Sequence, residues 1–222
     1  MRKKVILLTK SLKNGGYCVA GIDYYTGQWI RLVSGNQETK GALEKCGVPY
    51  KPLDIVIVDN ITPMPIQYQP ENYLIEEPYG IEGFYAWKKI GEYDINKLVE
   101  RYANNTNRYI LYNNNVHFCK EEVAGVEHSL EFVEITQVVI YTIFNEVTQK
   151  NKTKANFIYN GTSYNGMSVT DPDYYDARKI LQIKKCLVCL VHRRNLTTMA
   201  NIINSCLKYS AAKINYKAEG RM

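Results

Sequence analysis

The feature that most constrains the fold is a series of short β-prone runs separated by glycine-containing turns. In the first part of the chain the runs cover residues 4–9, 17–23, 28–33 and 52–58. Turn residues at Asn14-Gly15-Gly16 and Thr26-Gly27 separate the first three, and each run is only long enough for one strand. The pattern predicts about four short strands, of which the first three form a meander.

Prolines then crowd residues 62–80, where Pro63, Pro65, Pro70 and Pro78 lie close together. Proline lacks a backbone N–H and has a fixed φ, so regular strand pairing is not expected through this segment. We interpret residues 67–75 as an ordered, partly extended connector. After it, Asp94 precedes apolar residues at helical spacing, which predicts a short helix over residues 95–102.

The second half is again rich in strand signals. Residues 129–134, 137–144, 153–159, 162–169 and 185–191 are β-prone, and Asn160-Gly161 is a hairpin signal. Asp171 followed by Pro172 is typical of a helix N-terminus and predicts a helix near residues 172–183. Residues 197–204 are interpreted as a helical turn, and residues 207–216 as a closing strand.

These segments predict a mainly β fold with a few short helices. We expect a first barrel over residues 1–65, a proline-rich connector with a short helix over 66–128, and a second barrel with a helix over 129–222. Five- or six-stranded Greek-key barrels suit strands this short, because closing a barrel removes the exposed edges.

Composition and charge are typical of a binding surface, but they do not identify its ligand. The chain has a formal net charge of +6 and a pI near 8.8, which attracts polyanions modestly and falls short of a dedicated nucleic-acid domain. Its 19 tyrosines provide aromatic surface whose hydroxyl groups keep it compatible with water.

The six cysteines and the apolar segments bear on location and metal binding. The apolar run at residues 5–8 is too short for a signal peptide, and residues 132–144 are too short to span a bilayer. We therefore expect a cytoplasmic protein with reduced thiols and no membrane contact. Cys186 and Cys189 have the spacing of a metal knuckle, but on a strand they face opposite ways, so no metal site is expected.

Several segments resemble a bacterial family of dual OB-domain proteins. They are Gly21 with residues 27–34 (GQWIRLVS), the connector residues 69–75 (QPENYLI), residues 157–164 (FIYNGTSY) and residues 168–172 (SVTDP). The resemblance implies two OB-like barrels packed side by side and a role in nucleic-acid or nucleotide recognition in prokaryotic defence. The chain departs from the pattern at residues 192–195 (HRRN), where the family has a small glycine-containing turn.

No catalytic constellation is recognisable. The three histidines, His117, His128 and His192, are far apart and lie in no motif, and Asn14-Gly15-Gly16 lacks the helix and lysine of a phosphate-binding loop. Acidic residues such as Asp171 and Asp173 are explained by helix capping. We expect a non-enzymatic protein without cofactor or metal.

The first functional hypothesis is a module that binds single-stranded DNA or RNA. OB-type surfaces stack bases on aromatic side chains while basic side chains follow the phosphates. The residues predicted to do this are Trp29 and Arg31 on one strand face, Lys10 and Tyr17 on neighbouring strands, and Lys150, Lys152 and Lys154 near a hairpin turn. In the competing interpretation Trp29 fills the barrel core, Arg31 caps its rim, and the lysines form a solvated loop.

Two alternatives stay open. The chain is also consistent with a sensor that encloses a small ligand, such as a nucleotide, between its halves. The residues predicted for that pocket are Gln69, Glu71, Asn72, Tyr73 and Asp171. The third possibility is a protein-interaction scaffold with a tyrosine-rich interface and an unidentified protein partner.

Overall fold

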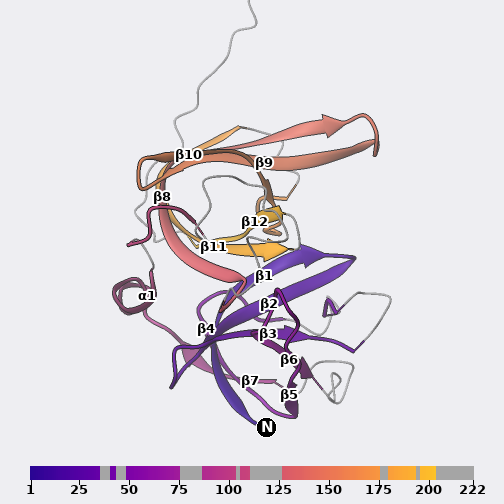
Figure 1. The fold of residues 1–222 in the computed structure, drawn as a ribbon, viewed down its shortest axis with the longest axis vertical. Coiled ribbons are helices and arrows are strands. Elements are labelled where there is room, and N and C mark those ends of the chain that lie inside the picture. Colours follow the sequence, from indigo (N-terminus) through magenta and orange to yellow (C-terminus); the bar gives the residue numbers. More distant parts are fainter. Residues whose placement is uncertain are drawn as a thin grey trace, which may run out of the picture.

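The fold consists of two β-barrels that lie against each other (Figure 1). The computed structural model describes residues 1–35, 41–43, 49–75, 87–103, 106–110, 127–175, 180–193 and 196–203. Strands dominate this part of the chain, and its one α-helix is short. The predicted mainly β fold class with two OB-like barrels is confirmed.

The first barrel is a seven-stranded sheet in the order β5-β6-β3-β2-β1-β4-β7. Its strands are β1 (Lys3–Lys13), β2 (Gly16–Asp23), β3 (Trp29–Val33), β4 (Asp54–Val58), β5 (Ile61–Pro63), β6 (Asn72–Ile75) and β7 (Trp87–Glu92). The β1-β2-β3 meander that the turns predict is present, and β3 pairs in parallel with β6.

The sheet curls because β4 and β5 follow one another directly along the chain. β4 pairs with β1, whereas β5 pairs with β6 at the other end of the sheet order. Asn60, between them, has a φ of 53°, which bends the chain. The backbone groups of Met1 and Ile61 also exchange hydrogen bonds of 2.7 and 3.1 Å. The β5 end of the sheet is therefore joined to the residue that precedes β1.

The second barrel is closed, with the order β10-β12-β11-β8-β9. Its strands are β8 (Leu130–Asn145), β9 (Lys150–Tyr159), β10 (Thr162–Val169), β11 (Leu181–Arg193) and β12 (Leu196–Ile203). As in the first barrel, a three-strand meander is followed by a parallel pairing, here between β10 and β12. The second barrel thus has the five-stranded Greek-key order of an OB-fold. The first has the same order when β4 and β5 are counted as one bent strand, and it adds β7 beside β4.

Three apolar cores hold the molecule together. One lies inside each barrel, and the third lies between them. This third core joins Ile6 and Leu8 of β1 to Leu130 and Phe132 of β8, all at most 1% exposed. Each such side chain contributes about 2 kcal/mol of hydrophobic stabilisation. A backbone hydrogen bond of 2.7 Å from Leu12 to the Thr170 carbonyl also crosses the interface.

Helix α1 (Ile95–Tyr102) confirms the helix expected from the Asp94 signal. The Asp94 carboxylate accepts hydrogen bonds from the backbone N–H groups of Asn96 and Lys97 at 2.8 and 3.1 Å. Leu98 is fully buried in the core between the barrels, so the helix is anchored beside both of them.

The helix predicted near residues 172–183 is wrong where the structure describes it. Residues 172–175 form turns, and Leu181 begins β11; residues 176–179 lie outside the described residues. The Asp171 carboxylate accepts a hydrogen bond from the Asp173 N–H, so the Asp-Pro signal starts a turn. Pairing of Leu181–Ile183 with β8 overrides any local helical preference.

Two further segments differ from expectation. The predicted helical turn at 197–204 is wrong over Leu196–Ile203, which is β12, and the predicted closing strand at 207–216 lies outside the described residues. The expected connector contributes β6 and β7 to the first sheet, so the expected boundary at residue 65 falls within that sheet. Pro63 and Pro70 do not prevent this pairing, because Pro63 ends β5 and Pro70 precedes β6.

Candidate functional site: a cleft between the barrels

A cleft of about 720 Å³ opens where the two barrels and the helix meet. The first barrel, the segment leading into β6, the end of α1 and the start of β8 all contribute to its walls. The lining residues are Ile22, Gly27, Gln28, Trp29, Pro70, Glu71, Tyr73, Arg101, Tyr102, Glu127, His128, Glu131 and Phe132. A volume of this size is typical of a pocket for a small organic ligand or a nucleotide unit.

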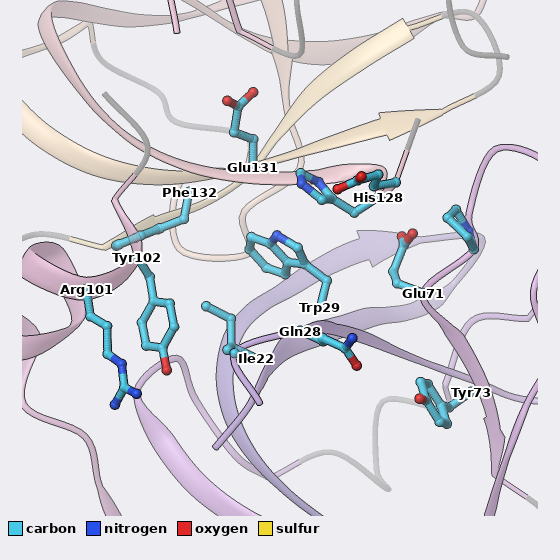
Figure 2. A pocket seen from close by; sticks show the side chains of 13 residues that line it. Ile22, Gln28, Trp29, Glu71, Tyr73, Arg101, Tyr102, His128, Glu131 and Phe132 are labelled. Atoms are coloured by element: carbon cyan, nitrogen blue, oxygen red, sulfur yellow. The ribbon is translucent and has the colours of Figure 1, made fainter. Parts of the chain in front are cut away.

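Trp29 lies in the middle of this cleft (Figure 2). It is the first residue of β3, and side chains alternate along a strand, so Ile30 and Leu32 enter the core of the first barrel. Trp29 and Arg31 therefore share the outer face, as predicted. That face is the one against which the second barrel packs. Trp29 is half-buried there, with its ring centroid 6.1 Å from that of His128.

Arg31 is bound in a buried network at the back of the cleft. Only 1% of its surface is exposed, and its guanidinium is 3.0 Å from the Glu71 carboxylate. It also donates to the Ser129 hydroxyl at 2.6 Å and to the Cys18 sulfur at 3.1 Å. Arg31 thus links β3 to the residue before β6 and to the residue before β8.

Both carboxylate oxygens of Glu71 accept hydrogen bonds in this network. Oε1 accepts from the Ser129 hydroxyl at 2.5 Å, and Oε2 accepts from the Ser129 backbone N–H at 3.1 Å. The Glu71 carbonyl accepts from the backbone N–H of Arg31 at 2.9 Å. A buried charge pair that is hydrogen-bonded this fully is neutralised within the protein.

The two sides of the cleft differ in chemistry. Figure 2 shows Arg101 and Tyr102 on one side of Trp29 and Glu71 and Tyr73 on the other, while the Glu131 carboxylate points away from Trp29. The Arg101 guanidinium lies 5.5 Å from the centre of the Tyr102 ring. A flat aromatic ligand could therefore contact ring faces in the middle of the cleft and a cationic group at its edge.

A glycine makes room for one wall. Gly27 has a φ of 74°, and a Cβ at this position would lie 3.2 Å from the Tyr102 ring. Glycine adopts this backbone conformation without strain and lets the ring of Tyr102 approach closely. The turn before β3 and the end of α1 are thereby held together at the cleft.

His128 presents a polar group to the same region. Its Nδ1 atom is buried and has no hydrogen-bond partner among the described residues. A buried imidazole nitrogen without a partner is costly, so it is a candidate for pairing when a ligand or water occupies the cleft. Because His128 lies in no sequence motif, only its spatial proximity to Trp29 indicates this role.

The structure does not join Lys10 and Tyr17 to Trp29. The Lys10 amino group lies 4.8 Å from the centre of the Tyr17 ring, so these two residues do meet on adjacent strands. However, Trp29 pairs with Ile22, five residues further along β2, which is about 17 Å at the usual rise of a strand. Burial lowers the pKa of Lys10. The predicted surface of Lys10, Tyr17, Trp29 and Arg31 is therefore not continuous.

The predicted phosphate contact of Arg31 requires an accessible guanidinium, and the structure encloses that group. The reason is that the outer face of β3 is covered by the second barrel. The competing interpretation placed Trp29 in the core of the first barrel. Trp29 instead lies outside that core and packs against the core between the barrels.

The three predicted lysines form a basic row on β9, not a loop. Lys150, Lys152 and Lys154 pair with Asn145, Ile143 and Tyr141 of β8, so they share one face of the hairpin. Lys154 donates to the Ser168 hydroxyl at 3.0 Å, and its pKa is lowered by burial and by Lys152. In Figure 1 the end of the β8–β9 hairpin projects beyond the body of the second barrel.

Of the residues predicted for a pocket, Glu71 and Tyr73 line the cleft, and Gln69, Asn72 and Asp171 do not. The Asn72 amide contacts the Gln69 side chain at 3.5 Å, and Asp171 is buried in its own turn. The lining residues missed by the sequence, such as Arg101, Tyr102 and Phe132, come from segments that only folding brings together.

The described residues contain no group of three or more His, Cys, Asp or Glu side chains that could hold a metal ion. Cys186 lies in the core of the second barrel and Cys189 in the core between the barrels, which confirms that they face opposite ways. Burial raises the pKa of the Cys186 thiol to about 12 and also raises that of Cys189. Within the described chain, no helix is long and apolar enough to cross a membrane.

The fold and the cleft place the chain in the class of paired OB-barrel proteins. The family model described as "Dual OB-containing domain" matches residues 3–211, and the chain therefore belongs to this family. The search of the curated proteins gives no match, and neither does the search of the solved structures.

Proposed function

We propose that the protein recognises a nucleobase in the cleft between its barrels, carried by single-stranded nucleic acid or by a nucleotide. The observation that carries this proposal is the placement of Trp29, which is half-buried in the middle of a cleft of about 720 Å³. Base stacking on an aromatic side chain contributes about 1–3 kcal/mol per base in single-strand binding proteins.

The polar groups around Trp29 suit a base better than a chain of phosphates. Glu127 and His128 offer a carboxylate and an imidazole that pair with amino and imino groups on the edge of a base. Deep in the cleft Glu71 is already neutralised by Arg31. Arg101, which is exposed at the edge, is the group suited to an attached phosphate. A base inside and a phosphate outside is the orientation that these charges favour.

A titration of labelled single-stranded DNA and RNA by fluorescence anisotropy, at low and physiological salt, tests this proposal. Nucleoside monophosphates are measured in parallel by calorimetry. We expect Trp29→Leu to weaken binding about tenfold or more, from the loss of stacking, and Trp29→Phe to retain most of it. Tyr175→Ala is the matched control, because Tyr175 is an exposed aromatic residue that does not line the cleft.

Unchanged affinity in a folded Trp29→Leu variant would show that the base is not held here. No binding of any of these ligands at low salt would reject nucleobase recognition altogether. Thermal unfolding of each variant distinguishes a lost contact from a lost fold.

A second candidate function, contact with a nucleic-acid backbone, is favoured by the row of lysines on β9. Lys150 and Lys152 are exposed, and neither forms an ion pair with another described residue. Alternate residues on a strand are about 7 Å apart, which suits successive phosphates of an extended strand. The involvement of such an activity in prokaryotic defence, and any protein partner, stay predictions.

A further inference from the structure

A cluster of three tyrosines lies beside the cleft. The ring of Tyr24 packs edge-on against those of Tyr25 and Tyr93, with centroid distances of 5.4 and 6.0 Å. Tyr24 and Tyr93 are partly buried against the core between the barrels, whereas Tyr25 is 75% exposed. The cluster is therefore anchored on one side and exposes the ring of Tyr25 on the other.

The cluster is continuous with the wall of the cleft. Tyr24 and Tyr25 belong to the same turn, from Asp23 to Gln28, that supplies Gly27 and Gln28 to the cleft. The Asp23 carboxylate stabilises this turn by accepting hydrogen bonds from the backbone N–H groups of Tyr25 and Thr26 at 2.9 and 3.1 Å. Tyr102 connects the two regions, since its ring lies against Gly27.

Cationic groups lie beside these rings. The Lys4 amino group is 3.6 Å from the centre of the Tyr24 ring and 5.7 Å from that of Tyr25. At the cleft edge Arg101 stands over Tyr102. Rings that stack on bases and cations that follow phosphates are the two components of a single-strand binding surface. Isolated exposed tyrosines are common on protein surfaces. An exposed tyrosine beside a lysine and a nucleobase-sized cleft has the composition of a second binding subsite.

We infer that the ligand is a dinucleotide or longer single strand, with one base against Trp29 in the cleft and the neighbouring base on Tyr25. In this arrangement Arg101 and Lys4 contact the phosphates that join and flank the two nucleotides. The inference rests on the proposed nucleobase function of the cleft and identifies its ligand as a strand instead of a free nucleotide.

The test compares ligands of increasing length, from a nucleoside monophosphate through a dinucleotide to a short single strand of the same base, on the full chain. With the unaltered protein, affinity is expected to rise at the dinucleotide. Tyr25→Ala is expected to remove most of that rise, about a tenfold loss for the dinucleotide and the strand, with the monophosphate unaffected. Tyr25→Phe is expected to restore it, because the ring face is retained, and Tyr175→Ala is the control.

Equal affinities for the monophosphate and the dinucleotide, or a Tyr25→Ala variant that binds both as the unaltered protein does, would overturn the second subsite. Trp29→Leu separates the two proposals: if it weakens the monophosphate while Tyr25→Ala affects no ligand, the cleft stands and the second subsite falls. If Trp29→Leu affects no ligand, the proposed function itself fails.

Discussion

The cleft and the β8–β9 hairpin both combine aromatic or apolar side chains with basic groups, and they differ in shape and charge. The cleft is concave and contains carboxylates, with Arg101 at its edge. The hairpin protrudes and carries three lysines on one face, with Phe144 and Val147 exposed near its tip. An enclosed site with acceptors suits a base, whereas a protruding basic strand suits phosphates.

A further difference is that the basic groups of the two regions have different roles. The Arg31 guanidinium behind the cleft is held in a buried hydrogen-bond network that joins the barrels, whereas Lys150 and Lys152 face the solvent. Each of these three side chains carries one positive charge. Their burial decides which of them can reach a ligand.

The largest expected effect is on stability, from removal of Arg31. In Arg31→Ala the buried Glu71 carboxylate loses its counter-charge, and we expect the free energy of unfolding to fall by about 3–5 kcal/mol. Lys152→Ala on the hairpin should change it by less than about 0.5 kcal/mol. Urea unfolding followed by circular dichroism measures both. Similar small losses in the two variants would contradict the structural role of Arg31.

Replacing both charged partners sharpens this prediction. We expect Arg31→Met combined with Glu71→Met to be more stable than Arg31→Ala, because no unpaired charge is left buried. If the double variant is instead the less stable one, the ion pair itself contributes more than the packing of these positions.

The next effect in size concerns the ligand. Gly27→Val places a branched side chain at a φ of 74° and against the ring of Tyr102, so it should displace the cleft wall. We expect a loss of base affinity of about tenfold or more together with destabilisation of about 1–3 kcal/mol. Gly161→Val, in the β9–β10 turn at a φ of 78° with open space around it, is the control for backbone strain alone. Equal loss of affinity in both would place the effect in overall stability.

A smaller effect is expected from the hairpin. Lys150→Gln with Lys152→Gln should reduce the slope of log affinity against log salt by about 1.4 for a single strand, from two lost phosphate contacts. The affinity for a nucleoside monophosphate should not change, because neither lysine lines the cleft. An unchanged salt slope would remove the hairpin from the binding surface.

The smallest expected effect is a pKa change within the hairpin. Burial lowers the pKa of Lys154 from its ordinary value, and the neighbouring Lys152 lowers it further. At a pH below this lowered pKa, the charged ammonium group of Lys154 therefore makes the folded state less stable. That cost disappears as the pH rises through the lowered pKa toward 10.5. Lys152→Gln should raise the pKa of Lys154 without restoring it fully, because burial remains. NMR titration of the Lys154 side chain measures it, and an unchanged pKa would exclude the contribution of Lys152.

Much of the local structure could be predicted from the sequence. The turns at Gly15 and Gly27, the helix after Asp94 and the strand alternation of β3 follow from preferences that act over a few residues. The same alternation correctly placed Trp29 and Arg31 on one face, and Cys186 and Cys189 on opposite faces. The helix expected after Asp171 failed because pairing with β8 was the stronger constraint.

What the sequence determined by itself was therefore the strand pattern, the mainly β class and the family resemblance. The tertiary structure decided which strand faces are covered. Arg31 is enclosed because Ser129, 98 residues away in the chain, packs against it, whereas Trp29, two residues earlier, is only half-buried in the cleft. Alternation along a strand specifies a face, but burial of that face depends on contacts between distant segments, which no local pattern encodes.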